Sequence, residues 1–488
     1  MNAKTLPVAI IGGGPVGLAA VAHLIERGET PVLFEAGESI AANIRHWGHV
    51  RLFSPWEFTV DGASVRLLEK HGWQMPPEKD LPTGNDLREK YLLPFSELPE
   101  VSDAIHLNAR VVAISRSNVD KMKDNGRDDA PFILHIEYAD GRENLIEARA
   151  VIDASGTWHN PNPIGANGLP AIGEKRHADR IFYGMPDVFG QDKARYANKR
   201  VMVVGSGHSA INALLDIAKL QQDYPQTQAF WVMRSANLQR VYGGQDDDAL
   251  PARGQLGSRI KAQVNSGAIR IVAPFRIGQM SLQSGNLEVV GDTPDGQETL
   301  IVDEVIATTG SRPDLEMLRE LRLELDPALE STRELGPMID PNIHSCGTVR
   351  PHGEAELRHP EKDFYIVGMK SYGRAPTFLL ATGYEQVRSV VAGLVGDWES
   401  ARDVQLNLPE TGVCSTDLGG EGGACCSPSA SIQSAPAFLS VSNIAVKASP
   451  LQLIQVSSNV DTSCGCGDDC CGDGVRSTTC GCDDTCCS

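Results

Sequence analysis

The 488-residue sequence predicts an α/β fold with two parallel-sheet units, followed by a largely disordered, cysteine-rich tail. Two glycine-rich turns, at 12–17 and 205–210, each follow a short apolar run and precede a stretch with helical spacing. Short, continuously apolar runs are typical of parallel strands buried on both faces. Eleven of the twelve cysteines lie beyond residue 411, which sets the tail apart from the rest of the chain.

The first glycine-rich turn has the spacing of a dinucleotide-binding site. The apolar run Val8–Ile11 is followed by Gly12, Gly14 and Gly17 in the order G-x-G-x-x-G. The first glycine permits a tight turn, the second lets a pyrophosphate approach the backbone, and the third allows close packing of helix on strand. A lone pattern of this kind is weak evidence, and the following residues decide its meaning.

A second predicted strand, Pro31–Phe34, ends in Glu35, about 20 residues after the glycines. A carboxylate at this position can accept hydrogen bonds from a ribose. The complete order of strand, turn, helix, strand and acid therefore favours a Rossmann-like domain that binds a dinucleotide, over an incidental glycine-rich turn. The residues predicted to bind it here are Gly12, Gly14, Pro15, Gly17 and Glu35.

The second turn repeats the pattern in a G-x-G-x-x-A form. The next apolar run, 229–233, ends at Arg234 and Ser235 without an acid. A cation at this position suits the 2′-phosphate of NADPH, where a carboxylate would repel it. The alternative is a solvated surface arginine. The residues predicted to bind NADPH are Gly205, Gly207, Ser209, Ala210 and Arg234.

Composition argues against several other classes of protein. The net charge of −19 would repel nucleic-acid phosphates. No run of about 18 apolar residues indicates a membrane span, and the N-terminal apolar run is too glycine-rich for a signal peptide. Only Cys346 precedes the tail, so the folded part lacks the distributed cysteines of a disulfide-stapled secreted protein. We expect a cytoplasmic enzyme with a small-molecule substrate and a separate thiol-rich tail.

The order of motifs over about residues 5–400 resembles that of flavin-dependent monooxygenases of the N-oxide-forming and Baeyer–Villiger type. Two stretches carry further resemblance, one around Trp47 and Arg51 and the other at 82–101. The alternative for each aromatic residue there is a core position. In such proteins, turns like 154–157 and 308–310 mark the exit from the FAD domain and the return to it. The resemblance thus adds Trp47, Arg51, Gly156, Gly310 and Gly368 to the predicted cofactor site.

The resemblance also implies domain boundaries. It predicts an FAD-binding domain at 1–160 and 335–400, an inserted NADPH-binding domain at 161–334 and a tail at 401–488.

The chain departs from this family at several motif positions. Gly173 and His177 keep the spacing of a family signature, but Ala171 replaces its phenylalanine. Phe53 stands where the Baeyer–Villiger type has an aspartate. Gly368 is followed by methionine instead of the common aspartate, so no carboxylate is assigned to the ribityl hydroxyls.

The tail contains an internal repeat of thiol clusters. CGCGDDCC at 464–471 recurs as CGCDDTCC at 480–487, and a vicinal pair at 425–426 follows Cys414. Closely spaced thiols can converge on one soft ion without a prebuilt fold. The alternative is a low-complexity tail with incidental cysteines. The predicted thiophilic metal or metalloid ligands are Cys414, Cys425, Cys426, Cys464, Cys466, Cys470, Cys471, Cys480, Cys482, Cys486 and Cys487.

These features predict a monooxygenase that uses FAD, NADPH and O2 to oxidise a soft nucleophilic substrate. Disulfide reductases of the glutathione-reductase type carry a redox cysteine pair soon after the first acid, and this chain has none there. The tail resembles arsenite-binding proteins, and some related monooxygenases accompany arsenic-resistance systems, which favours a trivalent arsenical as substrate. A reductase of a thiophilic metal or disulfide and a metal-sequestering protein remain alternatives. No catalytic residue is predicted, because the flavin carries the oxygen chemistry.

Overall fold

The computed structural model describes residues 5–237, 242, 251–343, 351–376 and 378–406. The chain divides into two units, 1–420 and 421–488. The second unit and all twelve cysteines, Cys346 included, lie outside the described residues. The predicted metal ligands of the tail therefore stay predictions.

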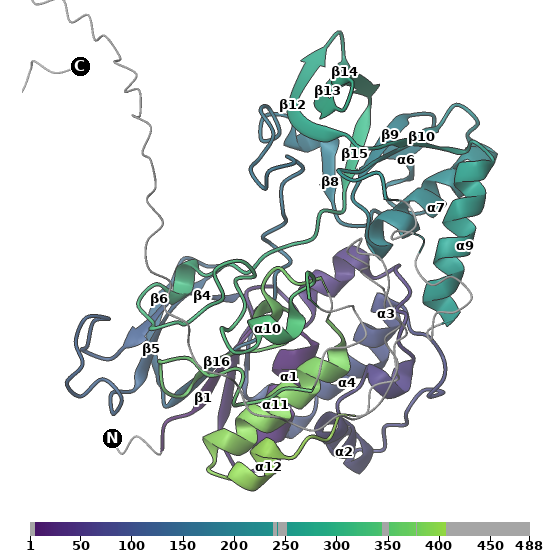
Figure 1. The fold of residues 1–488 in the computed structure, drawn as a ribbon. Coiled ribbons are helices and arrows are strands. Elements are labelled where there is room, and N and C mark those ends of the chain that lie inside the picture. Colours follow the sequence, from purple (N-terminus) through teal and green to yellow (C-terminus); the bar gives the residue numbers. More distant parts are fainter. Residues whose placement is uncertain (1–4, 238–241, 243–250, 344–350, 377, 407–488) are drawn as a thin grey trace, which may run out of the picture. The chain divides into compact units, whose positions relative to one another are not determined.

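The first glycine-rich turn follows β1 of a five-stranded parallel sheet, of which Figure 1 labels β1 and β16. Its strand order is β16-β7-β1-β2-β3, so the outer strand β16 comes from a distant part of the sequence. Ile11 of β1 pairs with Asp153 of β7, and Ile366 of β16 pairs with the same residue. The strands are β1 Val8–Ile11, β2 Pro31–Phe34, β3 Ile105–His106, β7 Ala150–Asp153 and β16 Phe364–Ile366.

A second five-stranded parallel sheet contains the second turn, with the order β11-β10-β9-β15-β8. The apolar run 201–204 lies in β9, and its four residues are buried. The predicted strand 229–233 is β10, which ends one residue earlier, at Val232. The strands are β8 Ile181–Tyr183, β9 Arg200–Val204, β10 Gln228–Val232, β11 Ile269–Val272 and β15 Glu304–Ala307.

Each parallel sheet is accompanied by a three-stranded antiparallel sheet. Asp140 and Gly141 form the turn between two of the antiparallel strands, and Gly141 has φ +84° there. The first antiparallel sheet contains β4 Ala109–Arg116, β5 Phe132–Tyr138 and β6 Glu143–Ala148. The second contains β12 Arg276–Gln283, β13 Asn286–Thr293 and β14 Gly296–Val302.

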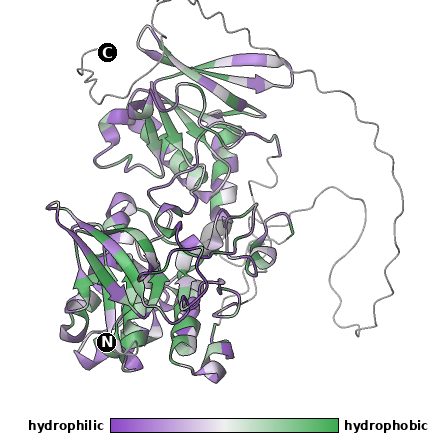
Figure 2. Ribbon diagram, turned by 90° about the vertical axis from the view of Figure 1, so that its left-hand side faces the viewer, coloured by the Kyte–Doolittle hydropathy of each residue, from purple (hydrophilic) through white to green (hydrophobic). Residues whose placement is uncertain are grey.

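Apolar helices cover the first parallel sheet. The buried helix α1 follows the first turn, and α11 lies beside it (Figure 1). Hydrophobic residues gather in the strands and in the helices packed on them (Figure 2). The helices of this part are α1 Pro15–Glu26, α2 Gly62–Lys70, α3 Gly84–Leu87, α4 Leu93–Ser96, α5 Pro99–Ser102, α10 Gly336–Ile339, α11 Leu380–Leu394 and α12 Trp398–Arg402. Short non-α turns lie at η2 Ala42–Trp47, η3 Trp56–Phe58, η4 Arg88–Leu92, η7 Glu316–Leu318 and η8 Gly368–Tyr372.

Two longer helices pack on the second sheet. Helix α7 starts directly after the second turn, and its apolar face packs around the fully buried Trp231. The helices and the short turn of this part are α6 Lys193–Tyr196, α7 His208–Asp223, α9 Pro251–Asn265 and η5 Ala178–Arg180. Among the described residues, no helix is both long enough and apolar enough to cross a membrane.

Two adjacent linkers connect the segments that form the two parallel sheets. The Thr157 and Ser311 hydroxyls are 2.7 Å apart, and the Asn162 side chain donates to the Thr309 carbonyl at 3.1 Å. Pro161 and Ser311 also form an antiparallel bridge. Hydrogen bonds therefore hold the two linkers side by side.

Candidate functional site

The first turn requires glycine at two of its three motif positions. Gly12 has φ +100°, and a Cβ on it would lie 2.7 Å from the Ala154 carbonyl oxygen. A Cβ on Gly17 would lie 1.9 Å from the Gly12 carbonyl oxygen. Because backbone occupies both spaces, any side chain would push the turn apart. These contacts confirm the tight turn and the close helix packing that the spacing predicts.

Gly14 is different, because its missing side chain faces open space. A Cβ there would meet nothing within 4 Å, and its φ of −83° is ordinary. Gly14 caps α1 without a side-chain hydrogen bond, and Pro15 begins the helix. The N–H groups and the positive dipole end of such a helix bind phosphate. This cradle fits the pyrophosphate of FAD.

Glu35 is fixed beside this turn by two backbone hydrogen bonds. The Gly13 N–H donates to its Oε2 and the Gly37 N–H to its Oε1, both at 2.7 Å. A carboxylate has about four acceptor sites, so capacity for ribose hydroxyls remains. Burial, followed by the charges of Arg110 and His46, lowers the pKa of nearby His159. Glu35 is therefore held in place by backbone N–H groups and lies near a histidine whose pKa is lowered.

The structure brings together the two stretches that carry the family resemblance. Arg51 pairs with Thr83 in an antiparallel bridge, and its exposed guanidinium donates to the Leu81 carbonyl at 2.6 Å. A Cβ on Gly84 would lie 2.8 Å from the Trp47 ring. Trp47 is partly buried against the core, in line with the alternative of a core aromatic.

The second turn repeats the geometry of the first. Gly205 has φ +135°, and a Cβ on it would lie 2.6 Å from Thr308 Oγ1. The Trp231 indole N–H donates to the Gly205 carbonyl at 2.8 Å, which fixes the backbone of the turn. Gly207 caps α7 without a side-chain bond, and a Cβ there meets nothing within 4 Å. This cradle also fits a dinucleotide pyrophosphate.

The remaining predicted residues surround these cradles. Ser209 and the buried Ala210 lie in the first turn of α7. Arg234 is exposed two residues beyond β10, where its Nη1 donates to the Ala166 carbonyl at 3.3 Å. The predicted glycines of the linkers and of η8 all have positive φ: Gly156 (+72°), Gly310 (+80°) and Gly368 (+69°).

One cluster was missed at the sequence level. Asp153, at the carboxyl end of β7, forms a buried ion pair with Lys370 of η8, with 2.7 Å between Oδ2 and Nζ. Lys370 also donates to Ser155 Oγ at 3.0 Å. In the sequence, this cluster is indicated by Asp153, an acid at the end of the otherwise apolar strand β7.

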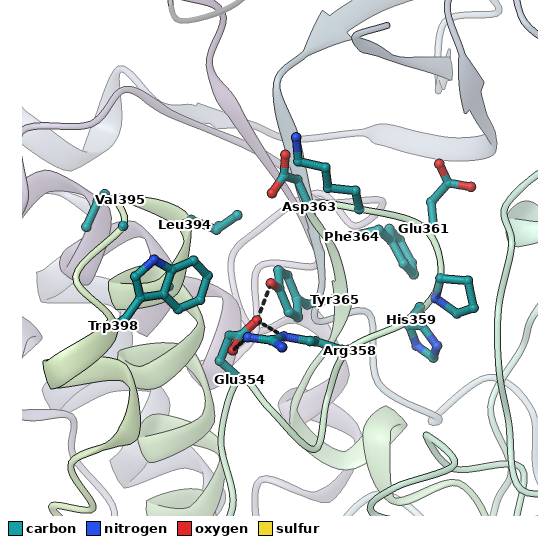
Figure 3. Close-up of a pocket in the computed structure, with 14 residues that line it drawn as sticks. Glu354, Arg358, His359, Glu361, Asp363, Phe364, Tyr365, Leu394, Val395 and Trp398 are labelled. Carbon is teal, nitrogen blue, oxygen red and sulfur yellow. Dashed lines mark hydrogen bonds and ion pairs between the residues drawn. The ribbon is translucent and has the colours of Figure 1, made fainter. Parts of the chain in front are cut away.

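A pocket of about 540 Å³ lies elsewhere, at the amino end of β16 and the C-terminal end of α11 (Figure 3). Glu354 accepts hydrogen bonds there from Arg358 and from the Tyr365 hydroxyl. The Arg358 guanidinium lies 5.5 Å from the centre of the Trp398 ring. The glycine turn follows the carboxyl end of β1. Because the strands are parallel, this pocket, at the amino end of β16, lies at the opposite end of the strands.

Two dinucleotide cradles on two parallel sheets define a flavin-dependent oxidoreductase that uses a nicotinamide nucleotide. A family model described as pyridine nucleotide-disulphide oxidoreductase matches residues 9–335, more than half of the chain. The protein belongs to this family. The predicted fold, enzyme class and cofactors, FAD and NADPH, are confirmed.

One curated protein is similar to part of the chain. A monooxygenase, cfoE, from Aspergillus candidus is 27% identical over 227 residues, which cover 45% of this chain and 34% of that protein. The matched segment thus spans about a third of that relative.

Solved structures share the fold at low identity. The bacillithiol disulfide reductase Bdr of Bacillus cereus has TM-score 0.57 and 18% identity, covering 80% of this chain and 99% of that one. The FAD-bound cadaverine monooxygenase DfoA of Erwinia amylovora has TM-score 0.56 and 13% identity, covering 84% and 98%. The ornithine N-hydroxylase KtzI of Kutzneria sp. 744 has TM-score 0.52 and 16% identity, covering 82% and 100%.

Proposed function

We propose that this protein is an FAD- and NADPH-dependent monooxygenase that oxidises a soft nucleophilic centre, with a trivalent arsenical as the substrate class. One observation carries this choice: residues 36–58, which follow the acid of the first cradle, contain no cysteine. A reductase of the glutathione-reductase type would carry its cysteine pair there. The curated monooxygenase relative supports the same choice.

Each cradle has a defined task in this proposal. The N-terminus of α1 at Gly14 holds the FAD pyrophosphate and Glu35 the ribose, while Gly207 and Arg234 hold NADPH. When bound, the flavin supplies electron transfer and oxygen activation. The protein binds, orients and excludes water, so no acid–base pair is needed. We further propose an FAD domain at 1–160 and 335–400 and an NADPH domain at 161–334, since the strands of each parallel sheet fall within one of them.

The proposed reaction balances. NADPH supplies two electrons as a hydride, a proton comes from solvent, one atom of O2 goes to the substrate, and the other leaves as water. A trivalent arsenical gains that oxygen and becomes pentavalent. The eleven tail cysteines would capture the substrate, because closely spaced thiolates bind thiophilic centres.

The test follows arsenite, O2 and NADPH together in the presence of catalase. Catalase removes the hydrogen peroxide of uncoupled turnover, which would otherwise oxidise arsenite chemically. We expect one arsenate per NADPH and per O2. In stopped flow, the NADPH-reduced protein mixed with O2 should show a transient absorbance unlike that of reduced or oxidised flavin. Direct return to oxidised flavin, with no arsenate, contradicts the proposal.

The second candidate is an NADPH-dependent reductase of a disulfide or thiophilic metal. The family description and the likeness to Bdr favour it. It predicts anaerobic NADPH oxidation that depends on a disulfide or Hg(II), which a monooxygenase would not show. A metal-sequestering protein on the same fold is a third candidate, and it predicts ion binding by the tail without either turnover.

A further inference from the structure

The side chains of Asp153 and Lys370, which form an ion pair, are both almost completely buried. The exposed fractions of the two side chains are 1% for Lys370 and 0% for Asp153. Ser155 completes the cluster, because its N–H (3.1 Å) and its hydroxyl (2.6 Å) both donate to Asp153 Oδ1. Desolvating two charges costs about as much as their attraction returns, so such a pair is weak evidence for a stabilising role. Its position in the fold suggests another role.

The cluster lies at the carboxyl ends of the parallel strands, where ligands of open α/β folds bind. Asp153 ends β7 directly beside Ile11, the last residue of β1 before the glycine turn. A Cβ on Gly12 would lie 2.9 Å from the Ser155 Cα. On the other side, a Cβ on Gly368 would lie 3.3 Å from the side chain of Val16 in α1. The cluster therefore adjoins the FAD cradle from two directions.

Ser155 is the member of the cluster that reaches the surface. It is partly exposed, whereas Asp153 and Lys370 are buried. Its hydroxyl hydrogen is directed to Asp153, and one of its lone pairs accepts from Lys370. A hydroxyl oxygen has two acceptor lone pairs, so one remains, in a direction that the other two bonds set. A hydroxyl oriented in this way is a ready acceptor for a ligand O–H.

We propose that Lys370 and Asp153 are positioning residues that fix the Ser155 hydroxyl as a hydrogen-bond acceptor for the hydroxyl-bearing ribityl chain of FAD. Ser155 would thus do what a carboxylate after β16 could do, while the buried charges stay away from the ligand. The inference concerns FAD binding alone, so it holds for either candidate reaction.

The first test removes only the hydroxyl. Apoprotein of Ser155→Ala is titrated with FAD and followed by flavin fluorescence, with Ser155→Thr as the variant that keeps an oxygen. We expect the Kd for FAD to rise about tenfold in the alanine variant, as for loss of one strong hydrogen bond. The threonine variant should recover most of the affinity. The apoprotein Tm and the Kd for NADP⁺ should stay at wild-type values.

The second test removes the buried charges together. Lys370→Met alone would leave Asp153 unpaired, so it is combined with Asp153→Asn. We expect the double variant to fold and to bind FAD about tenfold more weakly, or weaker still. Adding Ser155→Ala to it should reduce the affinity for FAD little further. Glu361→Gln is the matched control, because Glu361 is buried in another charge cluster at the amino end of β16. It should lower the apoprotein Tm and leave the Kd for FAD unchanged.

Two results would overturn the proposal. One is wild-type FAD affinity in Ser155→Ala. The other is a double variant that loses apoprotein stability but keeps its FAD affinity, as the Glu361 control is expected to do.

Discussion

Absence of a side chain has opposite consequences at two glycines of the first turn. At Gly17 the backbone of Gly12 fills the space where a Cβ would stand, whereas at Gly14 that space is open. Gly17 is thus needed by the fold itself, and Gly14 only by a ligand. The second turn repeats the distinction, with Gly205 enclosed and Gly207 open.

We predict that Gly14→Ala folds normally as apoprotein but binds FAD at least about tenfold more weakly, because its methyl group takes pyrophosphate space. The measurement is FAD titration of the apoprotein together with its Tm. Gly207→Ala is the matched control, and it should keep FAD and lose affinity for NADP⁺ instead. A stable Gly14→Ala variant with unchanged FAD affinity would place the pyrophosphate elsewhere.

Arg234 carries the prediction of coenzyme preference. A charged hydrogen bond to a phosphate contributes about 1.5–3 kcal/mol. Arg234→Ala should therefore raise the KM for NADPH about tenfold or more and leave the KM for NADH nearly unchanged. Steady-state rates of flavin reduction with both coenzymes measure this. Equal losses with the two would make Arg234 structural.

Among the elements, buried charge clusters join segments that are far apart in sequence. Glu361, just before β16, accepts from Arg116 of β4 at 2.8 Å and from Arg127 at 2.7 Å. Burial is the largest influence and raises the pKa of Glu361, but the hydrogen bonds from the two arginines outweigh it and leave the pKa lowered. The cluster therefore ties β16 to the neighbouring antiparallel sheet.

Glu361→Gln should reduce the free energy of unfolding by about 3–5 kcal/mol at pH 7, because two buried guanidinium groups lose their anion. Urea unfolding measures this. Since the folded pKa is depressed, the stabilisation by Glu361 is present above the unfolded pKa of about 4.3 and is lost as the pH falls below it. The variant should accordingly lose less stability than the wild type over that acid range. Parallel acid profiles for the two proteins would contradict this assignment.

The sequence predicted the elements whose signals are local. Val8–Ile11 and Pro31–Phe34 follow from the residues within each strand. The pairing of Asp153 with Lys370 could not be predicted in this way. These residues are 217 positions apart, and they meet only because β16 pairs with β7.

At the scale of the whole molecule, the tail and the catalytic part should be separable. Removing 411–488 should leave FAD content and NADPH-driven flavin reduction intact. Turnover should weaken at low arsenite concentration more than at saturation, because tethered thiols raise the local substrate concentration. The measurement compares full-length and truncated protein in titrations with arsenite, methylarsenite, zinc and mercury, followed by oxidation assays. Identical binding and turnover in the two forms would refute capture by the tail.

The late position of β16 has a consequence for how the protein is made. Residues 154–363, which contain the whole second parallel sheet, lie between β7 and β16. Chains fold from the N-terminus as they leave the ribosome, so the strands of the second sheet are all synthesised while the first still lacks its edge strand and Lys370. A nascent chain stalled before residue 364 would therefore already bind NADP⁺, whereas stable loading of FAD would wait until η8 has emerged.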